Sequence, residues 1–324
     1  MTVSHPAPLP VLVVGDANVD LVLRGDVVPR FGQAEQLAES GELVLGGSAS
    51  ITASGTARLG VPTSLLARVG ADIFGTFTLD ALGSHGVDVA SVEVAAGEVT
   101  GLSVILSTPD DRAILTVPGT IPTLTGAHAG AALREWTGRP GILHVGSYFL
   151  QPHLASDLPE VLAAARERGW TTSLDTNWDP DEKWAGLADV LGHVDVLLPN
   201  RNELRAIAAA LGLDATREAD PDAVLATRIA DRGPRVVVKD GARGGWSVGA
   251  DSQVVRAPGL AVDVVDTTGA GDSFDAGYLA ALAHGVTDES ERVRWAACAG
   301  SLSTLGTGGT GSQATLARLR AALA

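Results

Sequence analysis

The chain has 324 residues, of which 45% are hydrophobic and 19% charged, and its formal net charge is −15 at pH 7. This charge disfavours nonspecific attraction to nucleic acid and anionic membranes, and the single cysteine, Cys298, excludes a disulfide framework within the chain. No apolar run approaches the roughly 20 residues that span a bilayer, and the first ten residues lack the pattern of a secretory signal. We therefore expect a cytoplasmic protein without nucleic-acid or membrane partners.

Predicted strands and helices alternate along the chain. Short runs rich in β-branched residues, typical of buried strands, occupy residues 11–15, 63–70, 142–146, 171–175, 194–199 and 235–240. Stretches with helical spacing occupy residues 48–60, 153–169, 202–212, 270–285 and 313–323. This alternation favours an α/β fold over an all-α or an all-β fold.

Residues 19–45 and 98–117 break this alternation. Both contain segments such as DLVLRG and GLSVILST, whose pattern predicts half-exposed antiparallel strands with no helix between them. We expect the two excursions to form one small separate sheet within a single domain, 1–324. This sheet is either a lid over a cleft or an edge extension of the main sheet, and the sequence leaves both open.

The segment 264–282, VVDTTGAGDSFDAGYLAAL, passes from a β-branched run through a glycine-rich turn into a helical pattern. Small residues at 269–271 leave backbone amides uncovered at a helix N-terminus, where the amides and the helix dipole favour an anion. Asp272 falls beside this positive end, so we expect it to stay ionised and to accept a proton. A phosphate beside a fixed carboxylate suits phosphoryl transfer to an alcohol. The alternative is an ordinary strand, turn and helix with a favourable acid in the first helical turn.

The run D-T-T-G-A-G-D-S-F matches, residue for residue, the second signature of the ribokinase-like carbohydrate kinases, the PfkB family. The chain resembles this family over nearly its whole length. The resemblance implies a three-layer αβα sandwich with a mostly parallel central sheet and a small β-sheet lid. It also implies ATP and Mg²⁺ as cofactors, Asp272 as the catalytic base, and an anion hole formed by the amides of Gly269, Ala270 and Gly271.

The same resemblance implies a substrate site near the start of the chain. VVGDANVD (13–20) is similar to the first family strand, and LGGSASITASGTARLG (45–60) is similar to the first family signature. The implied substrate-binding residues are Asn18, Asp20, Gly46, Gly47, Ser48 and Ser147. Turn formation and helix capping are the alternative roles of Asn18 and Ser48. The family usually has an asparagine at the place of Ile51, and ribokinases proper have a lysine at the place of Ser48, so ribose specificity does not follow.

Nucleotide-binding residues are implied further along the chain. They are Asn177, Asn200, Lys239, Gly241, Ala242, Gly244 and Ala297. PNRNELR (199–205) resembles the N-x-x-E element of the family, in which Glu203 would bind Mg²⁺. An asparagine followed three residues later by a glutamate is also a helix capping box, and both roles can hold together.

A glycine-rich loop, STLGTGGTGSQ (303–313), lies near the end of the chain. It does not follow a strand, and no acidic residue lies about 20 positions on, so the pattern does not support a dinucleotide site. By resemblance, this loop and the DTTGAGD turn form a site for a monovalent cation such as K⁺. The residues that would contribute oxygens are Asp266, Thr268, Gly308 and Ser312.

The substrate positions offer groups of hydroxyl size but no basic side chain, apart from Arg112 on a predicted lid strand. A substrate that already carries phosphate would need an Arg or Lys, so we expect an unphosphorylated sugar. A nucleoside kinase of the same fold and a non-catalytic sugar-binding relative are the alternatives. The predicted lid is also a candidate surface for a homodimer.

Overall fold

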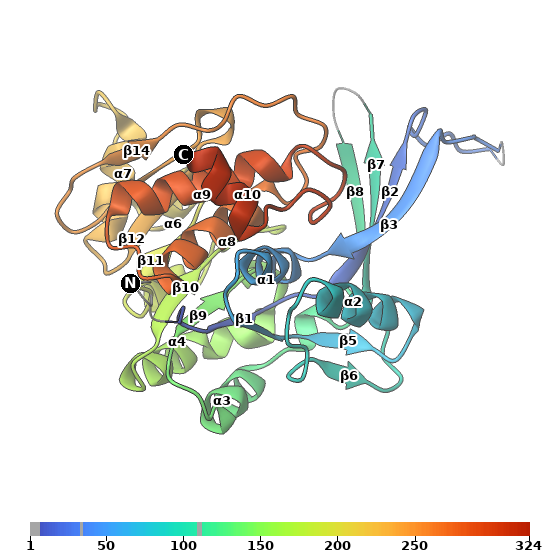
Figure 1. Ribbon diagram of the computed structural model, residues 1–324, viewed down its shortest axis with the longest axis horizontal. Helices are drawn as coiled ribbons and strands as arrows, with labels where there is room; N and C mark the ends of the chain where they lie inside the picture. Colours follow the sequence, from blue (N-terminus) through green and yellow to red (C-terminus); the bar gives the residue numbers. More distant parts are fainter. Residues whose placement is uncertain (1–6, 33–34, 109–111) are drawn as a thin grey trace, which may run out of the picture.

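An eight-stranded, mostly parallel sheet lies at the centre of this computed structural model, which describes residues 7–32, 35–108 and 112–324 (Figure 1). Its strands lie in the order β14-β13-β12-β11-β10-β9-β1-β4. Their bounds are β1 Val11–Val14, β4 Thr63–Leu66, β9 Ile142–Val145, β10 Thr171–Leu174, β11 Val196–Leu197, β12 Arg235–Lys239, β13 Gly245–Val248 and β14 Val255–Ala257. All neighbours from β4 to β12 pair in parallel, and only β13 and β14 are antiparallel. The predicted α/β class is confirmed.

Helices cover both faces of this sheet. In β1, Leu12 and Val14 are buried in one hydrophobic core, whereas Val11 and Val13 are buried in another, because successive side chains of a strand point to opposite faces. The first core is completed by α3 Gly126–Glu135, α4 Pro152–Glu167, α5 Leu187–Leu191, α6 Arg201–Ala210 and α7 Pro221–Ala230. The second is completed by α1 Ser48–Arg58, α2 Ile73–Ser84, α8 Ala270–Ala283, α9 Glu289–Ser303 and α10 Leu316–Leu323. The predicted three-layer αβα sandwich is therefore confirmed.

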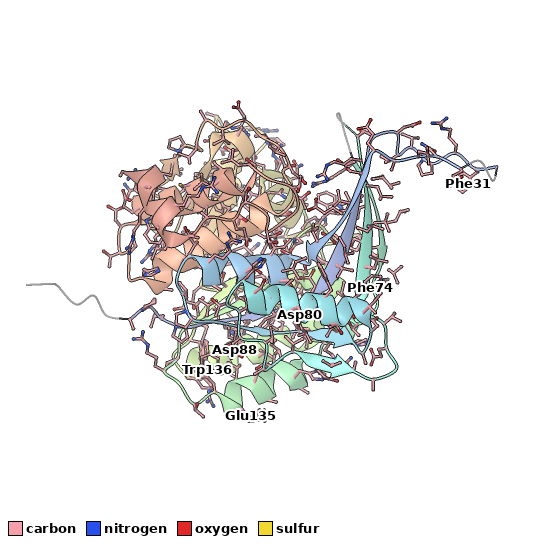
Figure 2. The ribbon with its side chains drawn as sticks, turned by 45° about the vertical axis from the view of Figure 1, so that its right-hand side comes forward. Phe31, Phe74, Asp80, Asp88, Glu135 and Trp136 are labelled. Carbon is pink, nitrogen blue, oxygen red and sulfur yellow. The ribbon has the colours of Figure 1, made fainter. Side chains whose placement is uncertain are left out.

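A separate four-stranded sheet stands away from the sandwich, with Phe31 near its tip (Figures 1 and 2). Its order is β3-β2-β7-β8, with β2 Asn18–Arg24, β3 Ser40–Gly46, β7 Gly101–Ser107 and β8 Arg112–Val117. Within the described residues none of these strands pairs with the central sheet, so an edge extension is excluded. We call this sheet the lid.

The lid strands were expected to be antiparallel, and this was wrong for one pair. β2 runs parallel to β7, while β2 with β3 and β7 with β8 are antiparallel. The reason is that β2 and β7 both leave the sandwich at the base of the lid, where Asn18 lies opposite Gly46 on one side and Gly101 on the other. The base of the lid is therefore the place where the predicted substrate residues meet.

Two predicted strands differ in extent from those observed. Residues 63–70 form two strands, because the chain leaves the central sheet after β4 and continues as β5 Arg68–Gly70, which pairs with β6 Glu93–Ala95. The strand expected at 194–199 is reduced to β11. Residues on both sides of β11 still form backbone hydrogen bonds with β10 and β12 or the residues next to these strands. Single turns of 3₁₀ helix occur at η1 Ile121–Thr123, η2 Tyr148–Leu150 and η3 Gly241–Arg243. Among the described helices, none combines the length and the apolar character needed to cross a membrane.

Candidate active site

The turn at 269–271 leads directly into α8 and places Asp272 in its first helical turn. Gly269 is the N-cap with φ 69°, and a Cβ there would lie 2.5 Å from the Cα of Gly309, so this position requires glycine. The amide of Ala270 donates to the carbonyl of Thr267 at 3.2 Å. The amides of Gly269 and Gly271 have no backbone acceptor in the part of the chain that the structure describes. Two of the three predicted anion-hole amides are therefore available to an anion.

The carboxyl group of Asp272 is not held fully ionised, contrary to the expectation from its place at a helix N-terminus. Burial raises the pKa of Asp272 to about 7, a hydrogen bond from the Ser48 hydroxyl lowers it, and the charge of Asp175 raises it further. A buried carboxyl group with few donors disfavours its charged form. Near neutral pH this group therefore exchanges its proton readily, which suits a general base.

Asn18 and Asp20 lie at the base of the lid, and the Asn18 amide donates to the carboxylate of Asp20 at 3.0 Å. A Cβ at Gly46 would collide with the Asp20 carboxylate, and one at Gly47 would lie 2.9 Å from Oδ1 of Asn18. The glycine pair thus makes room for these two polar side chains. Burial raises the pKa of Asp20 to about 6. The four predicted residues lie together as expected.

Asp16 is a buried residue of this region that the sequence analysis missed. Its carboxylate accepts hydrogen bonds from the backbone amides of Ser48 at 3.1 Å and Ala49 at 2.9 Å, so it caps α1 in place of Gly47, which has no side chain. Since the Ser48 hydroxyl contacts Asp272, Ser48 joins Asp16 to the predicted base. The signal available in the sequence was an acidic residue placed directly after a buried strand.

Ser147 and Asn177 form a second buried support. Both have positive φ, at 55° and 53°, and the Ser147 amide donates to the side-chain oxygen of Asn177 at 3.0 Å. The Ser147 hydroxyl also hydrogen-bonds Asp16. Asn177 therefore shapes the turn that carries Ser147. Neither Asn177 nor Asn200 lines the cavity where the other five predicted nucleotide residues lie.

Behind the base, Lys239 is clamped between two buried carboxyl groups. Its Nζ lies 2.8 Å from Oδ2 of Asp175 and 3.1 Å from Oδ2 of Asp275. Burial raises the pKa of Asp275 well above its usual value. Burial also acts to raise the pKa of Asp175, but the charge of Lys239 and the hydrogen bonds that Asp175 accepts together outweigh it, so the pKa of Asp175 is lowered. Two adjacent carboxyl groups cannot easily both be ionised, so Asp275 holds the proton and Asp175 the charge. Lys239 is one of the implied nucleotide-binding residues, and these two contacts hold its amine.

A cavity of about 470 Å³ lies beside the 269–271 turn. Five of the predicted nucleotide residues line it, together with Gly271 and the apolar side chains of Leu260, Val262 and Phe274. These five are Lys239, Gly241, Ala242, Gly244 and Ala297. The loop at 259–264 contributes Leu260, Ala261, Val262 and Val264 to the lining, and no predicted strand or helix covered residues 259–263. Such a mostly apolar cavity beside backbone amides suits a ligand with a flat apolar part and an anionic part.

Asn200 and Glu203 form the capping box of α6. Oδ1 of Asn200 accepts from the Glu203 amide at 3.0 Å, and Oε2 of Glu203 accepts from the Asn200 amide at 2.7 Å. Burial raises the pKa of Glu203 to about 7, and Asp175 adds to this. The capping alternative is confirmed. A carboxyl oxygen beyond the cap bond is the kind of ligand that Mg²⁺ prefers, so Glu203 also fits the role of metal ligand.

The comparison with known families decides the identity of this arrangement. The model of the pfkB family of carbohydrate kinases matches residues 9–316. The chain belongs to this family. Asp272, the glycine turn and the cavity described above are therefore parts of a carbohydrate kinase.

Individual relatives agree with this kinase in length and fold. The chain is 28% identical over 306 residues to ribokinase of Bacillus subtilis, covering 94% of this kinase and 96% of that protein. It is 25% identical over 279 residues to a nucleoside kinase of Methanothermobacter thermautotrophicus, covering 85% and 82%. The structure of Arabidopsis thaliana ribokinase complexed with ribose and ATP superposes with a TM-score of 0.82, at 26% identity, over 98% of this kinase and 99% of that chain.

Four residues of this kinase were expected to bind a monovalent cation. Three of them, Asp266, Thr268 and Gly308, lie together in the structure. The carboxylate of Asp266 accepts from the Thr268 amide at 2.9 Å and from the Gly308 amide at 3.0 Å. None of its hydrogen bonds within the described residues comes from Ser312. Asp266 also pairs with Arg24 of the lid, at 2.9 Å. The departure at Ile51 has its explanation here, because this buried side chain packs against Gly309 of the same loop.

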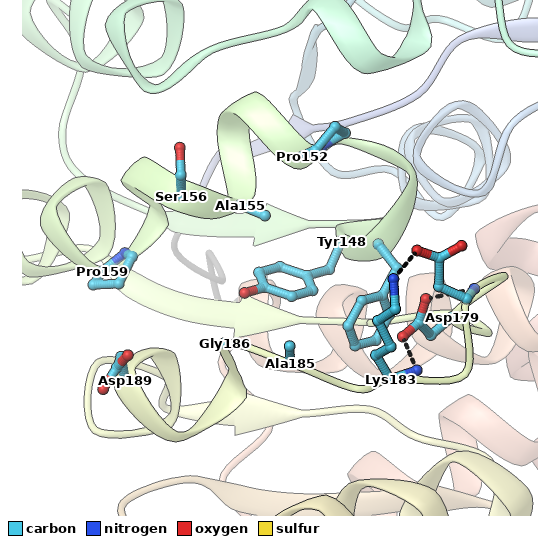
Figure 3. A pocket seen from close by; sticks show the side chains of 12 residues that line it. Tyr148, Pro152, Ala155, Ser156, Pro159, Asp179, Lys183, Ala185, Gly186 and Asp189 are labelled. Carbon is cyan, nitrogen blue, oxygen red and sulfur yellow. Dashed lines mark hydrogen bonds and ion pairs between the residues drawn. The ribbon is translucent and has the colours of Figure 1, made fainter.

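A second cavity of the kinase, about 420 Å³ in volume, lies between α4 and the loop before α5 (Figure 3). Tyr148, Asp179 and Lys183 are among its lining residues, and none of the predicted site residues lines it. Asp179 is buried and accepts hydrogen bonds from three backbone amides of its own loop. Its carboxylate therefore serves the loop and not a ligand.

Proposed function

We propose that this kinase transfers a phosphoryl group from ATP to a hydroxyl group of a small neutral sugar, with Asp272 as general base. The observation that carries the proposal is the position of Asp272. It contacts Ser48 of the predicted sugar site on one side and follows Gly271, which lines the cavity, on the other. An acceptor hydroxyl and a donor phosphate on these two sides would meet at its carboxylate.

In the proposed reaction, the sugar hydroxyl attacks the γ-phosphorus and its proton passes to Asp272, while ADP leaves with the bridging oxygen. The amides of Gly269 and Gly271 would stabilise the charge on the transferred group, because donors aimed at developing charge lower the barrier most. Adenosine would occupy the apolar cavity. Glu203 would hold Mg²⁺, which supplies neutralisation of phosphate charge when bound.

A neutral sugar suits the groups on the acceptor side. Asn18, Asp20 and Ser48 offer acceptors and donors of hydroxyl size. Arg112 of β8 donates to the hydroxyl of Thr268 at 3.1 Å, and its charge acts to lower the pKa of Asp20 against the larger effect of burial, so it lies near both the turn and the sugar site. The similarity to a nucleoside kinase favours nucleosides as the second candidate class.

A substrate screen tests the proposal. Purified enzyme with Mg-ATP would be offered ribose, other pentoses and hexoses, nucleosides, and sugar phosphates, with ADP release as the readout. We expect the highest kcat/KM with one unphosphorylated sugar. A preference for a nucleoside would move the assignment to the second candidate, and a preference for a sugar phosphate or no ADP release with any compound would contradict the proposal.

We also propose that the lid mediates a homodimer. Its edge strand β8 exposes Ile114, Leu115 and Val117, which are 52%, 63% and 54% exposed, and such apolar surface is typical of an interface. Sedimentation of the wild type and of Leu115→Glu tests this. A dimer that becomes monomeric in the variant supports the proposal, and a monomeric wild type contradicts it.

A further inference from the structure

Four donors converge on the carboxylate of Asp266. Its Oδ1 accepts from the Thr268 amide at 2.9 Å and from the Thr268 hydroxyl at 2.7 Å. Its Oδ2 accepts from the Gly308 amide at 3.0 Å and from Nη2 of Arg24 at 2.9 Å. Each carboxylate oxygen therefore already has two donors, which is close to its full capacity.

This donor set does not fit a monovalent cation. Potassium in proteins is held by oxygen dipoles that point their negative ends at the ion. Here Gly308 turns its N–H toward Asp266, and the Thr268 hydroxyl donates to Asp266 while it accepts from Arg112 at 3.1 Å. The groups that meet at Asp266 thus present the positive ends of their dipoles. One of them, the guanidinium of Arg24, carries a full positive charge.

The pair between Arg24 and Asp266 is well placed to persist. The side chain of Asp266 is 12% exposed and that of Arg24 is 28% exposed, so water screens the pair less than a surface pair. The guanidinium of Arg24 lies within ion-pair distance of the carboxylate and compensates its charge.

We propose that the guanidinium of Arg24 is the internal cation of this enzyme, which holds the 266–269 turn ahead of the base and makes turnover independent of K⁺. Arg24 is the last residue of lid strand β2, whereas Asp266 precedes the anion hole, so the pair also ties the lid to the catalytic turn. Arg24 is a positioning residue that acts through Asp266. The inference rests on the proposed kinase function only for its effect on turnover.

The test compares the wild type with Arg24→Gln in buffers of tetramethylammonium chloride, in which KCl replaces the organic salt at constant ionic strength. Wild-type kcat and Tm should not change with KCl. R24Q should lose about tenfold or more in kcat, because hydrogen bonds to charged groups contribute that much. KCl should restore part of this kcat and raise the Tm of R24Q, because the variant leaves the Asp266 carboxylate without its cation.

Two further variants control the experiment. Arg30→Gln removes an exposed lid arginine that pairs with Asp26, and it should behave as the wild type. Arg24→Lys keeps a positive charge, so its kcat and Tm should stay insensitive to KCl. This variant still tests the proposal if R24Q fails to fold. Activation of the wild type by KCl, or an R24Q enzyme with wild-type kcat, would overturn the proposal. If no compound gives ADP release, the kinase function fails, and the Tm response to KCl alone still decides the role of Arg24.

Discussion

Asp266 and Asp272 belong to one short sequence motif, yet the structure gives them opposite environments. Asp266 receives four donors, among them a guanidinium, and its pKa lies below the usual value. Burial raises the pKa of Asp272 to about 7, because only the Ser48 hydroxyl donates to its carboxylate and the charges of Asp175 and Asp16 add to the effect of burial. The depth of burial and the number of donors together therefore decide, more than the nearby helix terminus, which carboxyl group keeps its charge and which one exchanges protons.

Removal of Asp272, the proposed base, should have the greatest effect on turnover. In Asp272→Asn, kcat should fall by a factor on the order of 10² to 10⁴, because a general base contributes about that much. Binding of nucleotide, measured by calorimetry, should remain close to wild type. Asp263→Asn makes the same chemical change at an exposed position of the same segment. It is the matched control and should keep its turnover. Near-normal turnover in D272N would remove Asp272 from the reaction.

The carboxyl groups behind the base extend the comparison to Lys239. In Lys239→Met, the carboxylate of Asp175 loses the cation that compensates it and Asp275 loses a hydrogen-bond donor. Breaking such a buried pair should lower the free energy of unfolding by about 3–5 kcal/mol. Urea denaturation measures this loss. The other lysine of the chain, Lys183, pairs with Asp181 on the surface, so Lys183→Met should unfold like the wild type. Equal stability of the two variants would show that the buried cluster does not depend on Lys239.

Stability should respond to the two motif aspartates with opposite sign. At pH 8, Asp266→Asn should lower the free energy of unfolding by about 1.5–3 kcal/mol through lost charge-assisted hydrogen bonds, whereas Asp272→Asn should raise it by an amount on the order of 1 to 3 kcal/mol. The pKa of Asp272 in the folded protein, about 7, exceeds the ordinary value of 3.8. The contribution of this carboxyl group to the free energy of unfolding is therefore fully present below pH 3.8 and is lost as the pH rises through 7.

The pH dependence sharpens this test. The gain from D272N should be larger at pH 8 than at pH 5. Because the folded pKa of Asp266 is lowered, its contribution is present above 3.8 and is lost only as pH falls below that value, so the cost of D266N should be similar at pH 5 and pH 8. Thermal and urea unfolding at both pH values measure these differences. Changes of the same sign in the two variants would contradict the comparison.

The hydroxyl of Ser48, which donates a hydrogen bond to Asp272, should have a smaller effect, on the pH dependence of turnover. The rate should rise with pH through about 7, as Asp272 loses its proton, and then level off. In Ser48→Ala the carboxylate loses a hydrogen bond that lowers its pKa, so this limb of kcat/KM against pH should move upward by about one unit. Thr52→Val is the control, because Thr52 contacts only the backbone oxygen of Asp272, at 3.4 Å. An unmoved limb in S48A would show that Ser48 does not set this pKa.

Much of the fold and the site could be predicted because their signals are local. The buried strands, the helices after them, the 269–271 turn and the Asn200–Glu203 cap all depend on residues that are neighbours in sequence. The parallel pairing of β2 with β7 and the split of residues 63–70 could not be predicted, because strand partners lie far along the chain. Asp16 was missed for the same reason, since it caps a helix that begins after the β2–β3 hairpin.

The family, the αβα architecture and the position of the glycine-rich turn before α8 could be read from the sequence alone, because they follow from patterns within short segments. Only the tertiary structure decided the ionisation of the carboxyl groups and the partners of the two cations, Lys239 and Arg24. Burial and charge act through space, and the residues that contact Asp266 and Asp272, Arg24 of β2 and Ser48 of α1, lie far from both in the sequence.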